Sequence, residues 1–568
     1  MAQAATQPTF AVPDRPPVVL PHPVRMRVLG AVMIGVFLAA LDQTVVGTAL
    51  PRIITDLGGN DLYTWAFTAY LLTSTISGPL YGKLSDLFGR RPIMLFGIGV
   101  FMIGSLLAGL SQEMWQLVGA RGIQGLGAGA LFPIALAVIA DLFAPSERGR
   151  YQGLFGAVFG LSVLVGPAIG GLITDTIGWH FVFFLNIPIG AVVFAVVWRN
   201  LPSYHLAGDK PKIDYLGAAL FTGALVPILV GLTNKQTAAW TSPEVGGLLA
   251  LGAVILIAFL VVESRVREPI VPLDLFRNRS FTISVTAFFL ASFGFFATVV
   301  FLPRWFQVVG GSSATISGYQ MLPLLAGLIF SAIAAGQIVA RTGRYRLMLA
   351  GALFVMAFGL FMLSNLRADT PIPVLWAWMA VTGLGVGPTF AVFTLVVQNN
   401  VPVERIGTAT SNLTFFQQVG GTVGLAVTGT IFATSLGDQL PGQLAAKGVP
   451  PEVGGALAGS GGGLDSLTGV GDLGTAILAA LPEAARAQVQ PFIPAIVDAI
   501  HAAFSIATAN TFVLGIGASL VAAGLVLLLR EVPVTATEGE HDATQDAVRH
   551  AADPTAAKDV TPRATTTA

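Results

Sequence analysis

Long apolar segments alternate with short polar ones along most of the chain. A helix that crosses a bilayer needs about 20 mostly apolar residues. Segments of about this length occupy residues 27–50, 62–82, 93–111, 114–140, 152–174, 179–199, 213–233, 245–263, 280–302, 317–339, 347–365, 372–397, 408–435 and 503–530. The pattern predicts an all-α membrane protein with 14 transmembrane spans, followed by a polar, disordered tail at 531–568.

Basic residues are distributed unequally between the two sides of the predicted spans. The N-terminal tail 1–25 and alternate loops carry most of them, including Arg148 and Arg150. The opposite loops carry only Arg52, Lys235, Arg304, Arg367, Lys447 and Arg486. Because lysine and arginine are enriched in cytoplasmic loops, we predict a plasma-membrane protein with both termini in the cytoplasm.

The composition supports a membrane protein and argues against several other classes. Hydrophobic residues make up 54% of the 568 residues and charged residues 11%, whereas a soluble domain is about 25% charged. The 30 basic and 30 acidic side chains balance, so the net charge gives no reason to expect a nucleic-acid partner. The chain has no cysteine, and its 6 histidines lack metal-ligand spacing, so we predict neither a metal site nor a cofactor.

Two stretches of the first half recur in the second. "GKLSDLFGRRP" at 82–92 shares its glycine spacing with "GQIVARTGRYR" at 336–346, and residues 125–149 match residues 383–407. The offsets are nearly equal, which predicts two related six-span bundles around a central site. The predicted parts are the N-terminal bundle 26–200, a linker 201–276 with two inserted spans, and the C-terminal bundle 277–530.

A long outer loop is predicted at 437–500, within the C-terminal bundle. Its first half is rich in glycine, and its second half has the composition of short amphipathic helices. Two interpretations stay open, namely a solvated linker and a gate or partner-binding surface.

Asp42 lies inside the first span, in the stretch "AALDQTVVGTALP". Ionisable residues within a membrane are costly and mark functional sites. At the rise of a helix, Asp42 lies about 12 Å from the outer end of its span, and Arg121 about 9 Å from the outer end of the fourth. The two charges therefore lie at similar depth, where pairing would relieve the cost of burying both.

The Asp42–Arg121 pair has two interpretations, a purely structural ion pair and a proton-coupling site. Burial favours the neutral form of a carboxylate and a nearby arginine favours the charged form, so movement of the arginine could load or release a proton. The chain lacks a G-x-x-x-x-G-K-[ST] phosphate loop and thus an ATPase of its own. We therefore favour the proton-coupling site.

The loop between spans 2 and 3 carries five candidate latch residues, which are Gly82, Asp86, Gly89, Arg90 and Arg91. Glycines permit a tight turn, and an aspartate can cap a helix N-terminus or pair with a basic neighbour. Such a loop could latch one bundle to the other on the cytoplasmic side. The alternative is an ordinary basic loop of a cytoplasmic face.

Span 5 contains "GPAIGGLI", with Gly166, Pro167, Gly170 and Gly171. Small residues four apart allow close helix packing, and a proline frees a backbone carbonyl. We predict close packing here, with a hinge or a seal against ion leakage as an added hypothesis. Weaker candidates for a binding pocket are the polar or aromatic residues Trp65, Tyr70, Gln124, Asn186, Phe306, Tyr319, Asn412, Phe415 and Gln418.

These stretches resemble the motifs of the major facilitator superfamily, in particular its 14-span drug:proton antiporters. The resemblance covers about residues 26–435 and the last span, and includes "WHFVFFLNIPIG" at 179–190. It implies the major-facilitator fold, with Asp42 as the coupling carboxylate and Arg121 linked to proton transfer. Three positions depart from the family pattern, namely Gly47 for a common asparagine, His180 for a common arginine, and Ala340 where the second half would repeat Asp86.

We therefore expect proton-coupled efflux of lipophilic small molecules by alternating access, carried out by a monomer in the lipid bilayer. Predicted spans 9 to 14 contain no acidic residue, which favours neutral or singly charged substrates. The alternatives are an exporter of an endogenous lipid or secondary metabolite on the same fold and, less favoured, a non-transporting membrane receptor. An enzyme is not expected, because no Ser/His/Asp or metal-ligand constellation lies at membrane depth.

Overall fold

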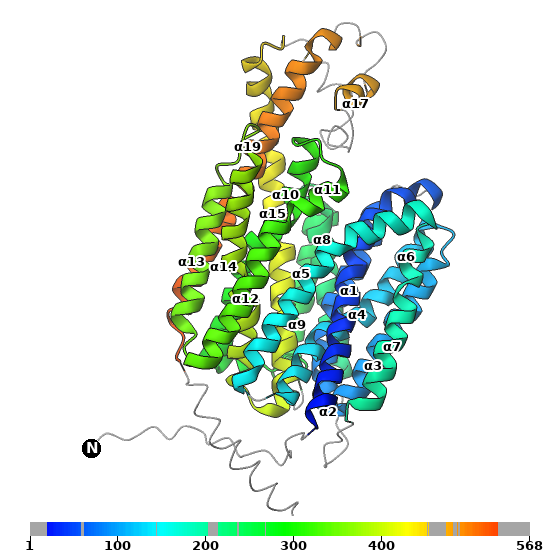
Figure 1. Cartoon of the computed structure of the whole chain (residues 1–568), viewed down its shortest axis with the longest axis vertical. Coiled ribbons are helices and arrows are strands. Elements are labelled where there is room, and N and C mark those ends of the chain that lie inside the picture. The colour runs from blue at the N-terminus through cyan, green and yellow to red at the C-terminus, as the bar shows by residue number, and fades with distance from the viewer. Residues whose placement is uncertain are drawn as a thin grey trace, which may run out of the picture.

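The computed structural model is almost wholly helical and describes residues 20–57, 62–143, 145–202, 214–235, 238–266, 269–450, 453, 473–480, 486 and 489–531. The predicted N-terminal tail up to residue 19, the tail from 532, and the glycine-rich part of the outer loop lie outside these residues. In Figure 1 the long helices run side by side along one direction.

The helices form an N-terminal helix group, a C-terminal helix group and a hairpin between them. The N-terminal helix group contains α1 (His22–Leu57), α2 (Tyr63–Phe88), α3 (Arg90–Gly109), α4 (Met114–Leu142), α5 (Pro145–Thr176), α6 (His180–Phe184) and α7 (Asn186–Asn200). The hairpin contains α8 (Tyr215–Asn234), the short η2 (Pro243–Gly247) and α9 (Leu248–Glu263). After η3 (Leu273–Arg277), the C-terminal helix group contains α10 (Arg279–Val308), α11 (Ala314–Gln320), α12 (Leu322–Thr342), α13 (Arg346–Leu363), α14 (Ile372–Asn399), η4 (Val403–Arg405), α15 (Ile406–Ala446), α17 (Leu473–Ala480), η6 (Gln490–Phe492) and α19 (Ile493–Val526).

Helix ends follow local signals in the sequence. The side chain of Asn278 accepts the backbone N–H of Ser280 at 2.9 Å, which starts α10. Ser313 accepts the N–H of Ile316 in the same way and starts α11. Gly343, with φ of 66°, ends α12 in the left-handed conformation that favours glycine.

Helices overlap each of the 14 predicted spans. Among the described residues, 12 helices are long and apolar enough to cross a membrane, which makes the chain a multi-pass membrane protein. The helices α2 and α5 are long but are not among those 12. Hydroxyl residues lower the mean hydropathy of α2, and several positions of α5 lie outside the part of the chain that was searched. The count of 14 spans therefore stays a prediction.

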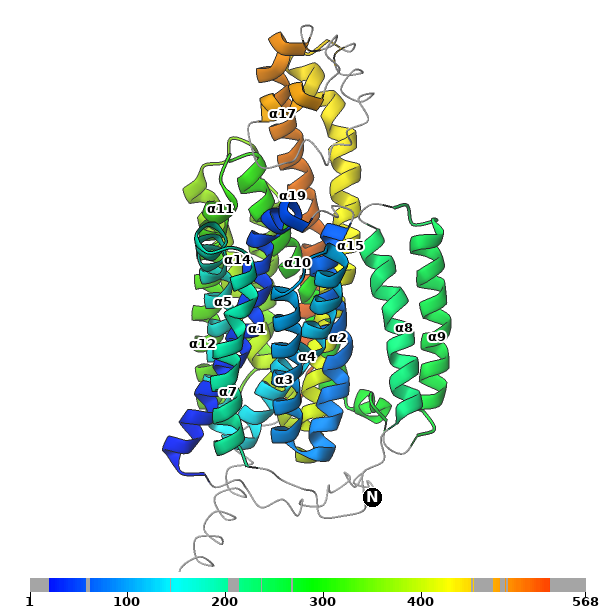
Figure 2. The same ribbon diagram turned by 90° about the vertical axis from the view of Figure 1, so that its right-hand side faces the viewer.

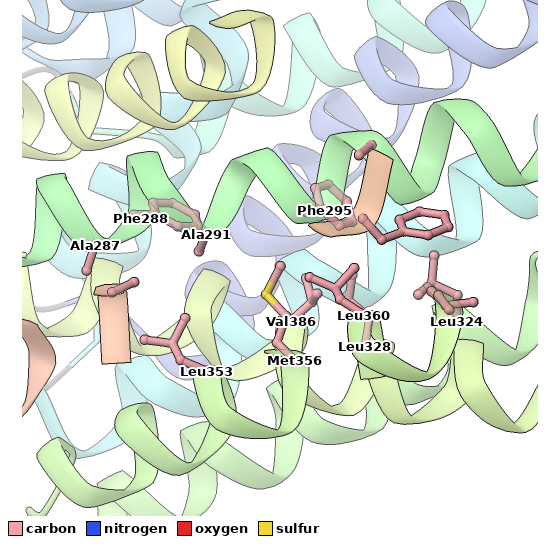
Figure 3. Close-up of a cluster of buried hydrophobic side chains, with 14 of the residues drawn as sticks. Ala287, Phe288, Ala291, Phe295, Leu324, Leu328, Leu353, Met356, Leu360 and Val386 are labelled. Carbon is pink, nitrogen blue, oxygen red and sulfur yellow. The ribbon is translucent and has the colours of Figure 1, made fainter. Parts of the chain in front are cut away.

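Each helix group has its own hydrophobic core. The N-terminal core joins α3 and α4 through buried residues such as Phe101 and Leu131. The C-terminal core joins α10, α13 and α14, and Phe288, Met356 and Val386 belong to its cluster of buried side chains (Figure 3). Apolar side chains fill both cores. Polar residues at membrane depth must therefore bond to one another, and the positions where they do so are the candidate sites.

The glycines of the repeated stretches make equivalent contacts in the two helix groups. A Cβ on Gly127 would lie 2.2 Å from the backbone nitrogen of Phe101, where α4 crosses α3. A Cβ on Gly385, its counterpart in the repeat, would lie 2.2 Å from the backbone nitrogen of Met356, where α14 crosses α13. Only glycine fits at either crossing, so the packing follows the repeat seen in the sequence.

The two helix groups also touch each other through repeated glycines, at the end where α1 begins, hereafter the predicted cytoplasmic end. A Cβ on Gly82 would lie 2.8 Å from the carbonyl oxygen of Gly407. A Cβ on Gly336 would lie 2.1 Å from that of Gly149. Gly82 and Gly336 are counterparts in one repeat, and Gly149 and Gly407 in the other, so the two contacts are related by the repeat.

The hairpin α8–α9 stands against the N-terminal and C-terminal helix groups at α2 and α15 (Figure 2). The ring centroids of Phe221 on α8 and Phe415 on α15 lie 5.4 Å apart, within a cluster that also includes Ile76 of α2. In contrast, only 17% of the apolar window of α9 is buried. The hairpin therefore covers the line where α2 meets α15 with one helix and leaves the other for lipid.

Several helices extend beyond the predicted spans, and three of these extensions change where residues were expected to lie. α10 continues to Val308, so Arg304 lies within a helix rather than in an outer loop, with its guanidinium 5.6 Å from the ring centroid of Phe432. α15 continues to Ala446 and α19 begins at Ile493, so the predicted outer loop 437–500 is partly helical (Figure 2). Apolar residues at helical spacing stabilise this extension, and its core contains Leu444, Val449, Val453, Ile477, Val489, Ile496, Ala499 and Ile500.

The contact between Gly149 and Gly336 gives a first prediction. Gly336→Val should push the predicted cytoplasmic ends of α5 and α12 apart, because overpacking costs about 1–3 kcal/mol. Spin labels on Arg150→Cys and Arg344→Cys, in a chain with no cysteine of its own, should then report a larger population at long distance. Gly351→Val is the control, since a Cβ there meets nothing within 4 Å; equal distance distributions in both variants would contradict the prediction.

Candidate functional site

Asp42 and Arg121 form a buried ion pair between α1 and α4. Asp42 is 2% exposed and Arg121 is fully buried. Two side-chain amides add to the pair, because Gln124 Nε2 of α4 and Asn186 Nδ2 of α7 each donate to Asp42 Oδ1 at 2.8 Å. The pairing expected from depth is thus present, and two of the weaker pocket candidates lie within it.

Arg121 is held by more than its carboxylate partner. Its Nη1 donates to Gln124 Oε1 at 2.7 Å, and its Nε donates to the carbonyl oxygen of Ala66 at 3.2 Å. The guanidinium carbon lies 4.3 Å from the ring centroid of Tyr70, a cation–π distance. The Tyr70 hydroxyl in turn donates to the carbonyl oxygen of Ala39 on α1 at 3.1 Å. Helices α1, α2, α4 and α7 therefore meet at one charged centre.

Ser105 of α3 extends this centre, although it was not selected from the sequence. Its Oγ accepts from Asn186 Nδ2 at 2.9 Å and donates to the carbonyl oxygen of Phe183 at 2.8 Å. A single serine in an apolar helix usually bonds to its own backbone. Only the crossing of α3 with α6 and α7 reveals its role, which is to orient the Asn186 amide toward Asp42.

The side chains around Asp42 are all hydrogen-bond donors to its carboxylate. An ionised carboxylate accepts hydrogen bonds at both oxygens and donates none, and Arg121, Gln124 and Asn186 all donate to Asp42. A proton on Oδ2 would remove the acceptor for the Arg121 guanidinium. Among the described residues, no group of three or more His, Cys, Asp or Glu side chains could hold a metal ion. Asp42 therefore holds together side chains from α4 and α7 through one buried carboxylate.

Asp86 of α2 forms a second buried centre, at the first turn of α15. Its Oδ1 accepts the N–H of Gly407 at 3.0 Å, and its Oδ2 accepts the N–H and the hydroxyl of Thr408, both at 2.6 Å. Arg90 pairs with Asp86 and donates through Nε to Asp141 Oδ2 at 2.9 Å. A negative charge at a helix N-terminus is stabilised by the exposed N–H groups. Asp86 thus connects the two helix groups, as the latch hypothesis expects.

The other latch candidates differ in what they do. Gly82 permits the close contact with Gly407 described above. Gly89 has φ of 91° and turns the chain from α2 directly into α3. Arg91 is half-buried and lies outside the hydrogen bonds around Asp86. Asp141 of α4 was not selected from the sequence. Its place at the same predicted side as the basic loop could have indicated that it pairs with Arg90.

The glycines of span 5 pack on the helix that carries Asp42. A Cβ on Gly166 would lie 1.9 Å from Thr44 Oγ1, and a Cβ on Gly170 2.3 Å from Thr48 Oγ1. Gly171 faces another direction, with Thr315 Oγ1 3.9 Å from its Cβ position. Pro167 lies within α5, and its side chain is outside the described part of the chain. Any shift of α5 therefore acts on α1.

The remaining pocket candidates make no described hydrogen bond to Asp42 or Arg121. Gln418 of α15 accepts from Thr75 Oγ1 of α2 at 2.7 Å, and buried Asn412 donates to the carbonyl oxygen of Thr408 at 2.8 Å. Phe306 is fully buried in the C-terminal core, and Phe415 packs on the hairpin. Trp65 is half-buried on α2, and Tyr319 is 41% exposed on α11.

A further polar contact between the helix groups was not selected from the sequence. Gln152 Nε2 of α5 donates to Gln398 Oε1 of α14 at 2.7 Å, and both residues are 2% exposed. Gln398 Nε2 lies 3.2 Å from Thr410 Oγ1 and from the carbonyl oxygen of Leu136. Uncharged residues far apart in sequence give no signal of such pairing.

Comparison with known proteins identifies the class to which this fold and these centres belong. A profile described as "Major Facilitator Superfamily" matches residues 32–425, so the chain belongs to that superfamily and is a membrane transporter by fold and family. It is 38% identical to the multidrug transporter protein MdtP of Bacillus subtilis (strain 168), over 74% of this chain and 77% of that one. It is also 38% identical to multidrug resistance protein 3 of the same strain, over 74% and 83%. Its fold is similar to that of the human organic anion transporter MFSD10 (TETRAN), with a TM-score of 0.54, 16% identity, and 73% and 94% of the two chains covered.

The packing under Gln124 gives a second prediction. A Cβ on Gly104 of α3 would lie 2.3 Å from the backbone nitrogen of Gln124. Gly104→Ala should lower the stability of the purified protein by about 1–3 kcal/mol, measured as a lower midpoint of thermal unfolding. Gly99→Ala is the matched control in the same helix, because a Cβ on Gly99 meets nothing within 4 Å. Equal midpoints for the two variants would be inconsistent with the crowding at Gln124.

Proposed function

We propose that the protein exports lipophilic small molecules in exchange for protons, by alternating access between its two helix groups. The observation that carries the proposal is the buried Asp42–Arg121 pair, in which the carboxylate is surrounded by donors from two further side chains. Ionisable groups at membrane depth mark ion pathways and proton relays. The relatives named as multidrug transporters support the class of substrate.

We further propose that a monomer acts in the plasma membrane with both termini in the cytoplasm. The distribution of arginines supports this orientation, since Arg90, Arg148 and Arg150 lie at the end where α1 begins. Arg304 no longer counts among the loop residues of the opposite side, because it lies within α10. Its removal from that side increases the difference in charge between the two sides.

Contacts between the helix groups support assigning this structure to a state closed toward the cytoplasm. Asp86 binds the first turn of α15. Gln152 bonds to Gln398, and Arg148 Nη1 donates to Asn399 Oδ1 at 3.3 Å. All three contacts lie at the predicted cytoplasmic end. Opening this end requires breaking them, whereas protonation of Asp42 releases Arg121 and with it the arrangement of α1, α2, α4 and α7.

Lipophilic substrates that are neutral or carry one charge fit this scheme best. The predicted spans of the C-terminal helix group contain no acidic side chain that could hold a second positive charge. Aromatic residues are frequent there, and 37 phenylalanines occur in the whole chain. Apolar and aromatic surroundings favour apolar ligands.

Asp42→Asn tests the proton-coupling role. In proteoliposomes with an imposed pH gradient, the variant should transport a lipophilic fluorescent dye no faster than the dye leaks across protein-free vesicles. The reason is that an asparagine side chain does not bind a proton near neutral pH. Wild-type protein should release protons when the dye is added, and Asp42→Asn should not. The control Asp175→Asn removes an exposed carboxylate from the last turn of α5 and should behave as wild type. Export by Asp42→Asn at the wild-type rate would refute coupling through this residue.

Asp86→Asn tests the latch. The variant loses charge-assisted hydrogen bonds to the N-terminus of α15, each worth about 1.5–3 kcal/mol, so the ratio of closed to open molecules should fall roughly tenfold or more. Distances between spin labels on Arg150→Cys and Arg344→Cys report that population. Asp274→Asn is the control, because its exposed pair with Arg405 contributes at most about 1 kcal/mol. A closed population in Asp86→Asn as large as in the control would rule out the latch.

A further inference from the structure

Two carboxyl groups meet at the base of the hairpin, outside both centres described above. Asp214 precedes α8, and its Oδ1 accepts the N–H of Gly217 at 2.8 Å. Glu263 is the last residue of α9 and is only 2% exposed. Its Oε1 accepts the N–H of Val271 at 2.6 Å, in the segment that leads to α10. One oxygen of each carboxyl is therefore occupied by a backbone donor.

The second oxygen of each carboxyl points toward the other. Asp214 Oδ2 and Glu263 Oε2 are both buried and have no hydrogen-bond donor within the described part of the chain. A Cβ on Gly217 would lie 2.1 Å from Asp214 Oδ2 and 2.9 Å from Glu263 Oε2, so the two oxygens face the same point. The glycine leaves room for them to approach. One proton between these two oxygens would give each of them a hydrogen-bond partner, and two carboxyl groups at one site favour keeping a proton.

The described charged groups around the pair offer it no cation. α8 has no charged side chain, and α9 has none besides Glu263. Of the elements that pack on α8, α2 carries Lys83 and Asp86, η2 carries Glu244 at the opposite end of the hairpin, and α15 has no charge before Asp438. Nearby in sequence, Arg265 is exposed and Asp274 pairs with Arg405. Neither carboxyl of the pair takes part in a described ion pair, so two negative charges here would repel each other without compensation.

We propose that Asp214 and Glu263 share one proton between Oδ2 and Oε2 and so form a second proton-binding site, separate from Asp42. One carboxyl then donates its O–H to the other, and both buried oxygens gain a partner. Loss of the proton leaves two adjacent buried charges, which separate and release the bond from Val271 to Glu263. Because the pair lies at the predicted cytoplasmic end, it responds to the pH on that side and controls how the hairpin is fastened to the start of the C-terminal helix group.

A bound metal ion fits these residues less well than a proton. Calcium takes six to eight oxygen ligands and magnesium six, whereas only two carboxyl oxygens are free here. The described residues contain no third His, Cys, Asp or Glu near the pair. A proton needs only the two oxygens that are present.

Infrared spectroscopy of the purified full chain without substrate tests the proposal. In wild type minus Glu263→Gln difference spectra at about pH 6, where an exposed glutamate is ionised, the carbonyl band of a protonated carboxyl should be present. It should disappear at higher pH as the carboxylate bands grow. Asp214→Asn should shift the band, because the pair shares the proton. The control Glu244→Gln, an exposed carboxylate on the same hairpin, should give only carboxylate bands at about pH 6.

Two results would overturn the proposal. One is a Glu263 difference spectrum that matches that of Glu244 at every pH. The other is loss of the protonated band on addition of calcium chloride at constant pH, which would identify a cation site. Since no substrate or gradient is used, neither result bears on export or on Asp42.

Hydrogen exchange at Val271 gives a second measurement that does not depend on spectral assignment. After correction for the intrinsic rate, exchange in wild type should accelerate roughly tenfold or more as the band disappears, because a hydrogen bond to a charged group is lost. Glu263→Gln should keep its protection at all pH values, since its amide can donate to Asp214 without a proton. Equal pH dependence in the two proteins would contradict the shared proton.

Discussion

Asp42 and Arg121 meet inside the N-terminal helix group because the bilayer offers neither charge a partner. This requirement determines how the surrounding helices are placed. Arg121 and Gln124 come from α4, Asn186 from α7, and Tyr70 from α2, and each has a defined contact with the pair. Because the donors belong to different helices, the charge on Asp42 and the packing of these helices are physically linked. The two amide donors satisfy the second carboxylate oxygen, as any buried ion pair requires.

A buried charge also needs partners at the boundary between the helix groups, where Asp86 finds them in a different way. Asp86 is neutralised by Arg90 on its own side and by backbone N–H groups of α15 on the other. No cation from the C-terminal helix group is needed, so the contact can break without leaving an unpaired positive charge there. The counterpart contact, Gly149 with Gly336, has no such charge, because Ala340 occupies the position equivalent to Asp86. Two contacts related by the repeat thus differ in sensitivity to charge.

The sequence was informative where a single residue conflicts with its surroundings. Asp42 and Arg121 stand out in apolar spans, and their depth was enough to predict that they pair. The roles of Ser105 and Gln398 could not be predicted, because a neutral polar residue in a helix is common and its partner lies on another helix. The composition of the second half of the outer loop indicated short amphipathic helices, whereas the continuation of α15 to Ala446 was not expected, because Leu444 packs on residues distant in sequence. Spans followed from composition, whereas contacts between helices required the structure.

Helix α5 connects the two kinds of contact. Toward its predicted outer end, Gly166 and Gly170 lie against Thr44 and Thr48 of α1, the helix that carries Asp42. Toward its beginning, Gly149 lies against α12 of the C-terminal helix group. At these contacts α5 presents glycines, so it has no side chain there that could change rotamer to absorb a movement of a neighbouring helix. A shift of α1 is therefore expected to move α5 as a whole. In the proposed mechanism, release of Arg121 from Asp42 frees α1, and α5 is the helix that contacts both α1 and the C-terminal helix group.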